Sequence, residues 1–239
     1  MPRLKKVKYM TTRRPVKAPR QLLVGVIASP ADLRFAFAMR QPPDVFEFRL
    51  DCLCDIVNQL ERKMSTLRAP KIMTARDPRE GGANNLTLDK RRELLSRFLP
   101  QAKYIDVELR SARAFKPLLT RARKGNVRVI LSFHDFNSTP TSRSLHAKIP
   151  TAKKLGADIF KVATHTQKPS DLARLVDFIT NNDSGLRLSA MGIGKLGGIS
   201  RLLLATCGSV LNYTSLGESH IEGQLPIAVL RSSLRAAPR

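Results

Sequence analysis

Short apolar runs alternate with longer helical stretches along most of this chain. Eight runs have the length and composition of buried strands, at residues 22–28, 45–50, 71–74, 103–108, 128–132, 158–162, 187–190 and 209–213. Helical stretches fill the gaps, with the clearest signals at residues 89–99, 111–124 and 169–180. Parallel strands need crossover connections such as helices, so this alternation predicts a parallel sheet. Eight such units in one α/β domain fit a (β/α)8 TIM barrel, with a doubly wound open sheet as the alternative.

The segment before the first strand differs from the rest of the chain. Residues 1–20 carry eight Lys and Arg residues, three prolines and no acid, and they show no hydrophobic periodicity. We therefore expect a flexible basic arm at residues 1–20 and a single barrel domain at residues 21–239.

Charge limits the choice of partners. The chain has 42 Lys and Arg residues against 19 Asp and Glu residues, a formal net charge of +23 that extends well beyond the arm. Such a field attracts anions, including nucleic acid and small carboxylates. Aromatic residues make up only 5% of the chain, and we find no nucleic-acid-binding motif. We expect nonspecific nucleic-acid binding at most, and keep a basic nucleic-acid-binding barrel as an alternative.

Other protein classes are disfavoured by the apolar runs and the cysteines. No apolar run approaches the roughly 18 residues that a membrane span requires. The three cysteines include Cys52 and Cys54, which are too close together for an ordinary disulfide or half of a usual zinc site. We expect reduced thiols in a cytoplasmic protein with no membrane partner.

Polar residues gather where the predicted strands end, the part of a barrel that carries its chemistry. They are Glu47, Arg49, Asp51, Arg76, Glu80, Asp106, Glu108, Ser132, His134 and Lys161, followed further along the chain by Arg201 and, in the loop after the last strand, by Gln224. Side chains alternate faces along a strand, so Lys161 shares the inner face with Ile159 and Ala163. Phe160 and Val162 then face the helices.

A lysine on the inner face has two interpretations. Partial desolvation lowers the pKa of a lysine amine and makes it nucleophilic towards a carbonyl. Alternatively, Lys161 forms an ion pair with an acid such as Glu47 or Asp106. The His, Arg and carboxylate residues at matching strand ends favour the first interpretation.

The other polar residues suit an acid–base site for an anion. His134 is a candidate general acid and base, oriented by Glu80 or Asp135, although a single histidine is often only part of the core. Arginine forks match carboxylates, which makes Arg49, Arg76 and Arg201 candidate anion ligands rather than surface cations.

Two other site types are rejected. Residues 192–197 satisfy the G-x-G-x-x-G pattern and Glu218 follows about 20 residues later, but only one strand–helix–strand unit remains for a dinucleotide. Asp106, Glu108 and His134 lack the spacing of a metal site. We expect neither a cofactor nor a metal.

Several segments in this order resemble one family, the type I 3-dehydroquinate dehydratases (3-dehydroquinases), from about residue 21 to Pro226. The matching segments are residues 47–51, 74–76, 80–82, 106–109, 132–136, 139–140, 160–163, 191–192, 199–201, 208–209 and 223–226. The resemblance implies a (β/α)8 barrel that dehydrates 3-dehydroquinate to 3-dehydroshikimate in the shikimate pathway to aromatic amino acids. It also implies a homodimer that needs no metal or organic cofactor.

The resemblance assigns roles to individual residues. Lys161 would form an imine with the C3 ketone, and His134 would remove the C2 proton and then assist loss of the C1 hydroxyl. Glu80 would orient His134, with Asp106 and Glu108 supporting the Arg and Lys groups. Substrate binding falls to Glu47, Arg49, Arg76, Arg201 and Gln224. An imine-forming barrel of the aldolase type is the alternative enzyme.

Three positions depart from the family pattern. Gly25 stands where a substrate-contacting serine is frequent in the first strand, and Phe133 where a hydrogen-bonding residue is common. In the last loop His220 replaces a serine, whose hydroxyl Ser219 would then have to supply.

Overall fold

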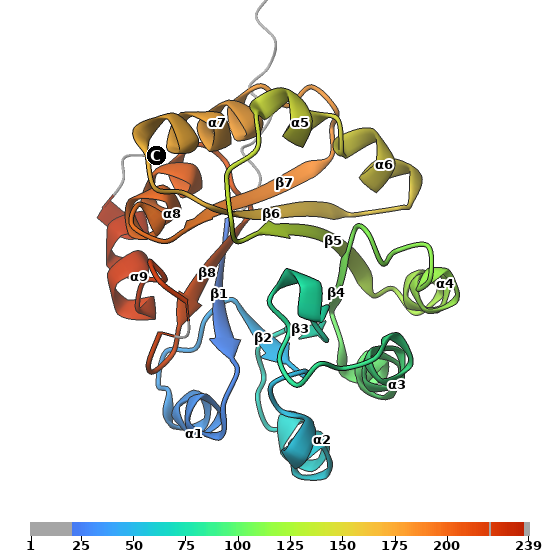
Figure 1. Cartoon of the computed structure of the whole chain (residues 1–239). Coiled ribbons are helices and arrows are strands. Elements are labelled where there is room, and N and C mark those ends of the chain that lie inside the picture. Colours follow the sequence, from blue (N-terminus) through green and yellow to red (C-terminus); the bar gives the residue numbers. More distant parts are fainter. Residues whose placement is uncertain (1–20, 220, 237–239) are drawn as a thin grey trace, which may run out of the picture.

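Eight parallel strands form a nearly closed barrel in the computed structural model, which describes residues 21–219 and 221–236 (Figure 1). The predicted arm at residues 1–20 lies outside the described residues. The strands are β1 (Leu22–Ile27), β2 (Val45–Arg49), β3 (Lys71–Thr74), β4 (Tyr104–Glu108), β5 (Arg128–Asp135), β6 (Ile159–His165), β7 (Arg187–Ile193) and β8 (Leu211–Ser215). From β1 to β7 each strand pairs with the next one in the chain, and β8 pairs with β1. This confirms the (β/α)8 barrel, and the doubly wound open sheet is wrong.

Helices surround the strands (Figure 1). They are α1 (Pro30–Ala38), α2 (Val57–Met64), α3 (Leu88–Phe98), α4 (Lys116–Lys124), α5 (Ser142–His146), α6 (Ile149–Lys154), α7 (Pro169–Thr180), α8 (Gly197–Thr206) and α9 (Ile227–Ala236), with the short 3₁₀ helices η1 (Cys54–Ile56), η2 (Pro78–Glu80) and η3 (Leu99–Gln101). Helix α7 has the predicted bounds. Helix α4 begins at Lys116 instead of residue 111, because Pro117 has no N–H to donate and fits only the first turn of a helix.

Three strands run further than predicted, and the extra residues include His134 and apolar residues that line the cavity described below. β5, β6 and β7 each continue for three residues, and parallel pairing persists between Asp135 and Thr164 and between His165 and Ile193. The parallel backbone ladder continues because each extra residue still finds a partner on the neighbouring strand. β8 begins at Leu211, two residues later than predicted.

Side-chain alternation separates two hydrophobic layers. Ile159 and Ala163 belong to the cluster inside the barrel, whereas Phe160 and Val162 pack between the barrel and its helices. The predicted faces of β6 are therefore confirmed, and Lys161 points inwards with them.

A side chain at Gly25 would not point into the barrel interior, so this position offers no substrate contact in the structure. A Cβ at this position would lie 2.6 Å from the Leu216 side chain and 3.0 Å from Pro43, on the helix side of β1. Val26 and Ala28 point inwards instead. Phe133 also packs on the helix side, with the Lys148 ammonium 4.4 Å from its ring centroid.

Within residues 21–219 and 221–236, none of the helices combines the length and the apolar composition that a membrane crossing requires.

Candidate active site

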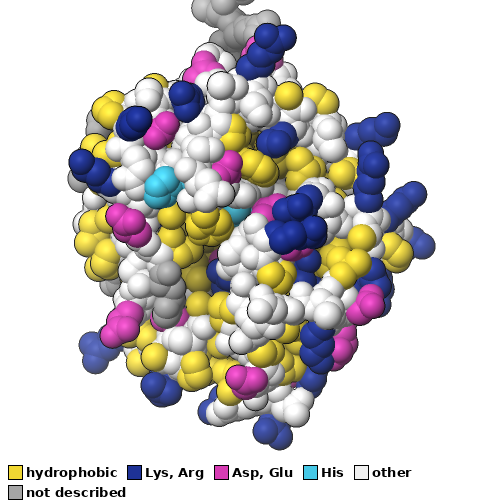
Figure 2. Space-filling model, in the orientation of Figure 1, with side chains coloured by type: hydrophobic (Ala, Val, Ile, Leu, Met, Phe, Trp, Pro, Cys, Tyr) yellow, Lys and Arg dark blue, Asp and Glu magenta, His cyan; other side chains and the backbone are white. Residues whose placement is uncertain are grey.

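A cavity of about 340 Å³ opens at the carboxyl ends of the strands. Figure 2 shows the hollow near the centre of this face, with hydrophobic side chains along one wall. All eight predicted site residues line it: Glu47, Arg49, Arg76, Glu80, His134, Lys161, Arg201 and Gln224. Apolar side chains of Met191, Ile193 and Ile221 complete the wall. The fold thus collects polar groups from β2, β5 and β6, from the segment after β3, from α8 and from the last loop around one small space.

Lys161 lies in the polar half of the cavity, which it lines together with Glu47, Arg76 and His134. Its Nζ lies 3.0 Å from Asp106 Oδ2 and 3.6 Å from Glu47 Oε1. Both ion pairs that we considered as an alternative to a nucleophile are therefore present. They do not withdraw the amine from the cavity, because Lys161 still lines it while being 3% exposed.

Arg76 fixes the acid beside that amine. Its guanidinium contacts Asp106 at 3.1 and 3.0 Å and Glu108 at 3.0 Å, and it donates to Ser132 Oγ at 2.7 Å. Burial opposes ionisation of Asp106, but the charges of Arg76 and Lys161 hold its pKa below the usual range. A permanent carboxylate therefore faces the amine, and Asp106 and Glu108 have the supporting contacts that the resemblance implied.

Arg91 supports this network and was missed in the sequence. Its Nη1 donates to Asp77 at 2.9 Å, its Nη2 donates to Glu108, and its Nε donates to the Ala75 carbonyl at 2.8 Å. The guanidinium is fully buried between α3 and the barrel. Its spacing from Leu94 and Leu95 puts it on the apolar face of α3, a signal that the basic composition concealed.

His134 is held by Glu80. The carboxylate Oε2 accepts the backbone N–H of His134 at 2.9 Å and lies 3.0 Å from its Nδ1. This contact assigns the ring proton to Nδ1 and leaves Nε2 unprotonated. Burial, together with the charges of Arg76 and Lys161, lowers the pKa of His134 well below its usual value. The site therefore holds a neutral imidazole with a free lone pair.

Glu80, and not Asp135, orients the imidazole. Asp135 instead accepts the backbone N–H groups of Asn137 and Ser138, both at 2.9 Å. Burial raises the pKa of Glu80 to about 7, so its charge changes near neutral pH.

Arg201 is the cation best placed to receive an anion. Its Nη1 donates to the carbonyls of Gly192, Gly197 and Gly223 at 2.7, 3.0 and 2.8 Å. Within the described part of the chain, no carboxylate lies within ion-pair distance of it. Burial lowers the pKa of Arg201 to about 10, so it stays protonated at neutral pH.

The remaining arginine at the mouth already has a partner. Arg49 binds Asp51 through two hydrogen bonds of 3.0 and 2.7 Å and donates to the Gly81 carbonyl. Its charge is balanced in the free protein, in contrast with that of Arg201.

The G-x-G-x-x-G segment binds Arg201 and packs against the loop between β8 and α9. Two of its glycine carbonyls bind the guanidinium, and Gly197 packs against Gly223, where an added Cβ would lie 2.9 Å from Cα. A side chain at Gly197 would push the loop that carries Gln224 away from the cavity. Close packing therefore accounts for these glycines without a phosphate.

Two further lining residues were absent from the predicted set. Tyr213, on the inner face of β8, has its ring centroid 4.0 Å from Lys161 Nζ. Inner-face alternation along β8 was the signal that could have found it. Cys52 also lines the cavity, but burial raises the pKa of its thiol to about 11, which disfavours a nucleophilic role.

Ser219 does not supply the missing loop hydroxyl to the cavity. It is exposed and donates to the Ile221 carbonyl at 2.7 Å, within its own loop. His220 lies outside the described residues. Ile221 and Gln224 are the residues of this loop that line the cavity.

Comparisons with known proteins agree on one family. Residues 31–238 match the type I 3-dehydroquinase family. The chain is 34% identical to a 3-dehydroquinate dehydratase of Pyrococcus abyssi over 193 residues, covering 80% of this chain and 86% of the relative. It is 28% identical to a catabolic 3-dehydroquinate dehydratase of Acinetobacter baylyi, covering 91% and 86%.

Solved structures give the same fold. A 3-dehydroquinate dehydratase from Geobacillus kaustophilus superposes with a TM-score of 0.81 at 26% identity, covering 90% of each chain. A deoxyribose phosphate aldolase from Aeropyrum pernix gives 0.55 at 14% identity, covering 90% of this chain and 89% of the aldolase. The second similarity extends to the barrel alone.

Proposed function

The chain belongs to the type I 3-dehydroquinase family and dehydrates 3-dehydroquinate, and from this premise we propose that Lys161 carries the reaction through an imine with the C3 ketone. The observation that supports this role is the position of its Nζ, in the cavity and 3.0 Å from the Asp106 carboxylate. The ammonium and the ketone combine to give a protonated imine and water. The positive charge stays at the same nitrogen, where the Asp106 and Glu47 carboxylates already face it.

The imine makes the next step possible. A protonated imine withdraws electrons from the neighbouring C2–H bond, which becomes acidic. The unprotonated Nε2 of His134 accepts the C2 proton, and the resulting imidazolium protonates the C1 hydroxyl as it leaves as water. Glu80 holds the ring through Nδ1 in both steps. Hydrolysis of the imine then releases 3-dehydroshikimate and regenerates the amine.

The rest of the cavity binds the substrate. Arg201 and Gln224 receive the carboxylate, because Arg201 is a buried cation that only carbonyl groups surround. Glu47, Arg49 and Arg76 hold the hydroxyl groups of the ring. Fixing both ends of the substrate keeps its C2 proton aligned with His134.

Chemical trapping tests this proposal. Borohydride added with 3-dehydroquinate reduces the imine to a stable amine, and we expect the adduct to map to Lys161 alone. The aldolase alternative shares this lysine and predicts cleavage of phosphorylated sugars. Sugar cleavage, or no adduct with 3-dehydroquinate, would reject the dehydratase mechanism.

The charge on Glu80 sets the pH dependence. The pKa of Glu80 is raised to about 7, so below that pH the carboxyl keeps its proton and no longer favours the imidazole tautomer with a free Nε2. We expect kcat/KM to rise as the pH increases through about 7. In Glu80→Gln, kcat/KM should be lower and should not change across this range. An unchanged rise in Glu80→Gln would assign the titration to another group.

Arg201 is expected to act on substrate affinity. A lysine in its place keeps the charge but loses the planar fork, and we expect KM to rise about 10- to 100-fold with a smaller change in kcat. Arg231→Lys is the matched control, because Arg231 also donates to backbone carbonyls but lies outside the cavity. Equal KM values for the two variants would contradict the carboxylate assignment.

We also propose that the protein works as a homodimer in the cytoplasm, within the shikimate pathway. The homodimer is supported by the family resemblance, and the location by its three free cysteines. Sedimentation equilibrium gives the mass of the particle and tests the dimer. The alternative of a nucleic-acid-binding barrel rests on net charge alone.

A further inference from the structure

Tyr213 has a hydroxyl group that the free protein does not use. The residue is 3% exposed, and within the described residues its hydroxyl has no hydrogen-bond partner. Buried hydroxyl groups are almost always paired, since an unpaired one loses its bonds to water without replacement. An unpaired phenol that lines a cavity therefore points to a partner that arrives with the ligand.

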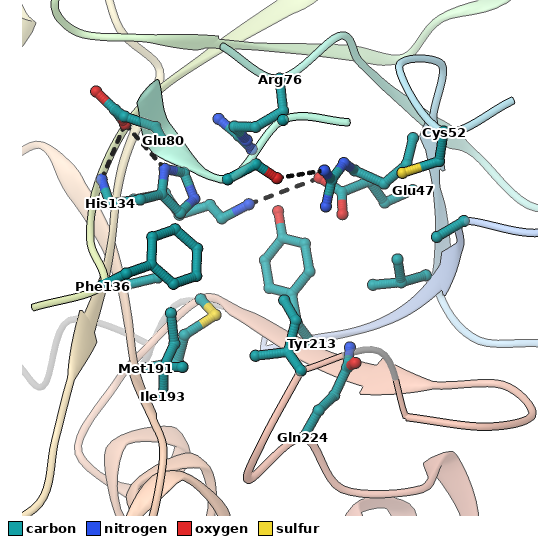
Figure 3. Close-up of a pocket in the computed structure, with 18 of the residues that line it drawn as sticks. Glu47, Cys52, Arg76, Glu80, His134, Phe136, Met191, Ile193, Tyr213 and Gln224 are labelled. Carbon is teal, nitrogen blue, oxygen red and sulfur yellow. Dashed lines mark hydrogen bonds and ion pairs between the residues drawn. The ribbon is translucent and has the colours of Figure 1, made fainter. Parts of the chain in front are cut away.

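The position of the ring identifies that partner. Lys161 Nζ lies 4.0 Å from the ring centroid, and in Figure 3 the hydroxyl end of Tyr213 points from β8 towards Glu47, into the polar half of the cavity. Any oxygen on C3 lies only two bonds from Nζ once the amine has added. An oxygen two bonds from Nζ can therefore reach the Tyr213 hydroxyl.

The neighbouring acids do not provide an alternative partner. Glu47 Oε1 accepts from Thr74 at 2.8 Å and faces the amine, and Asp106 binds Arg76, Ser132 and Lys161. Burial, with the charges of Glu47 and Asp106, raises the pKa of Tyr213 well above its usual value, so the phenol stays protonated and acts as a donor.

We propose that Tyr213 is a substrate-positioning residue whose hydroxyl donates a hydrogen bond to the oxygen on C3, an inference that rests on the proposed imine mechanism. The oxygen arrives as the ketone. It becomes the carbinolamine hydroxyl when the C3–N bond forms and the C=O π bond breaks. It leaves as water when the C=N bond forms. Tyr213 keeps its own proton throughout, so the balance remains ketone plus ammonium to protonated imine plus water.

Tyr213→Phe tests the hydroxyl while keeping the ring beneath Nζ. We expect kcat/KM and the rate of borohydride trapping to fall about 10-fold, while the thermal unfolding midpoint stays equal or rises because no native hydrogen bond is lost. Tyr104→Phe is the matched control. Tyr104 is also a buried tyrosine inside the barrel, but it does not line the cavity.

A second measurement isolates the step. In a His134→Ala background, where the imine forms but the C2 proton is not removed, heavy-oxygen water exchanges into the C3 ketone through the imine. We expect the added Tyr213→Phe change to slow this exchange by the same factor.

Three results would overturn the inference. The first is a borohydride-trapping rate in Tyr213→Phe equal to that of the wild type. The second is an equal loss of kcat/KM in Tyr213→Phe and Tyr104→Phe. The third is a loss of kcat/KM in Tyr213→Phe that is accompanied by a lower unfolding midpoint. Failure of the wild-type protein to form any adduct would instead reject the proposed function.

Discussion

Lys161→Arg is expected to lose dehydration activity by at least ~10⁴-fold and to give no borohydride adduct. A guanidinium keeps the positive charge opposite Asp106 and Glu47 but does not add to a ketone at neutral pH. The variant therefore separates the ion pair, which it preserves, from the imine, which it prevents. Steady-state formation of the conjugated product and the intact mass after reduction are the two measurements.

Lys161→Ala is the less selective variant of the pair. It should be equally inactive, but it also removes the cation that pairs with the buried carboxylates of Glu47 and Asp106, and this loss lowers the stability of the fold. Lys148→Ala is the control, because Lys148 also places its ammonium against an aromatic ring, away from the cavity. Turnover by Lys161→Arg within tenfold of the wild type would refute the imine mechanism.

His134→Ala is expected to separate the two halves of the reaction. Dehydration should fall about 10³-fold, within the range for loss of a general acid–base group. The imine should still form, because Lys161 and its carboxylates are unchanged, so borohydride should trap substrate on Lys161. In the wild type the imine passes on to product, whereas in this variant it should accumulate.

His146 provides the matched control for His134. His146→Ala removes a histidine on α5 that lies 3.7 Å from Asp177, outside the cavity, and should leave both steps intact. Equal loss of trapping and dehydration in His134→Ala would show that the imidazole is needed before the imine forms. The assigned role of His134 would then be wrong.

Much of the architecture is readable from local patterns. Periodicity locates the eight strands, and alternation puts Lys161 on the inner face with Ile159 and Ala163. Six of the eight predicted site residues lie on β2, β5 or β6 or in the segment after β3, and in a parallel barrel the carboxyl ends of all strands meet at one mouth. The alternation of faces and the direction of the strands are therefore sufficient to bring these six together, whereas Arg201 on α8 and Gln224 on the last loop depend on how those segments pack.

Partners, by contrast, are decided by distances between residues far apart in sequence. Arg76 and Arg201 look alike in the chain, yet Arg76 binds Asp106 and Glu108, whereas Arg201 meets only carbonyl groups. Likewise, the choice between Glu80 and Asp135 as the partner of His134 depended on how η2 folds over β5. No local pattern encodes these pairings.

The sequence by itself determined the number of strands, the inner face of β6 and most of the polar groups at the mouth, because these follow from the chain's periodicity and direction. Only the tertiary structure decided which charges are balanced, that Gly25 points to the helices and that the Tyr213 hydroxyl is unpaired. The physical reason is one of range. Periodicity acts between neighbours in the chain, whereas burial and hydrogen bonding depend on atoms that only folding brings within about 3 Å.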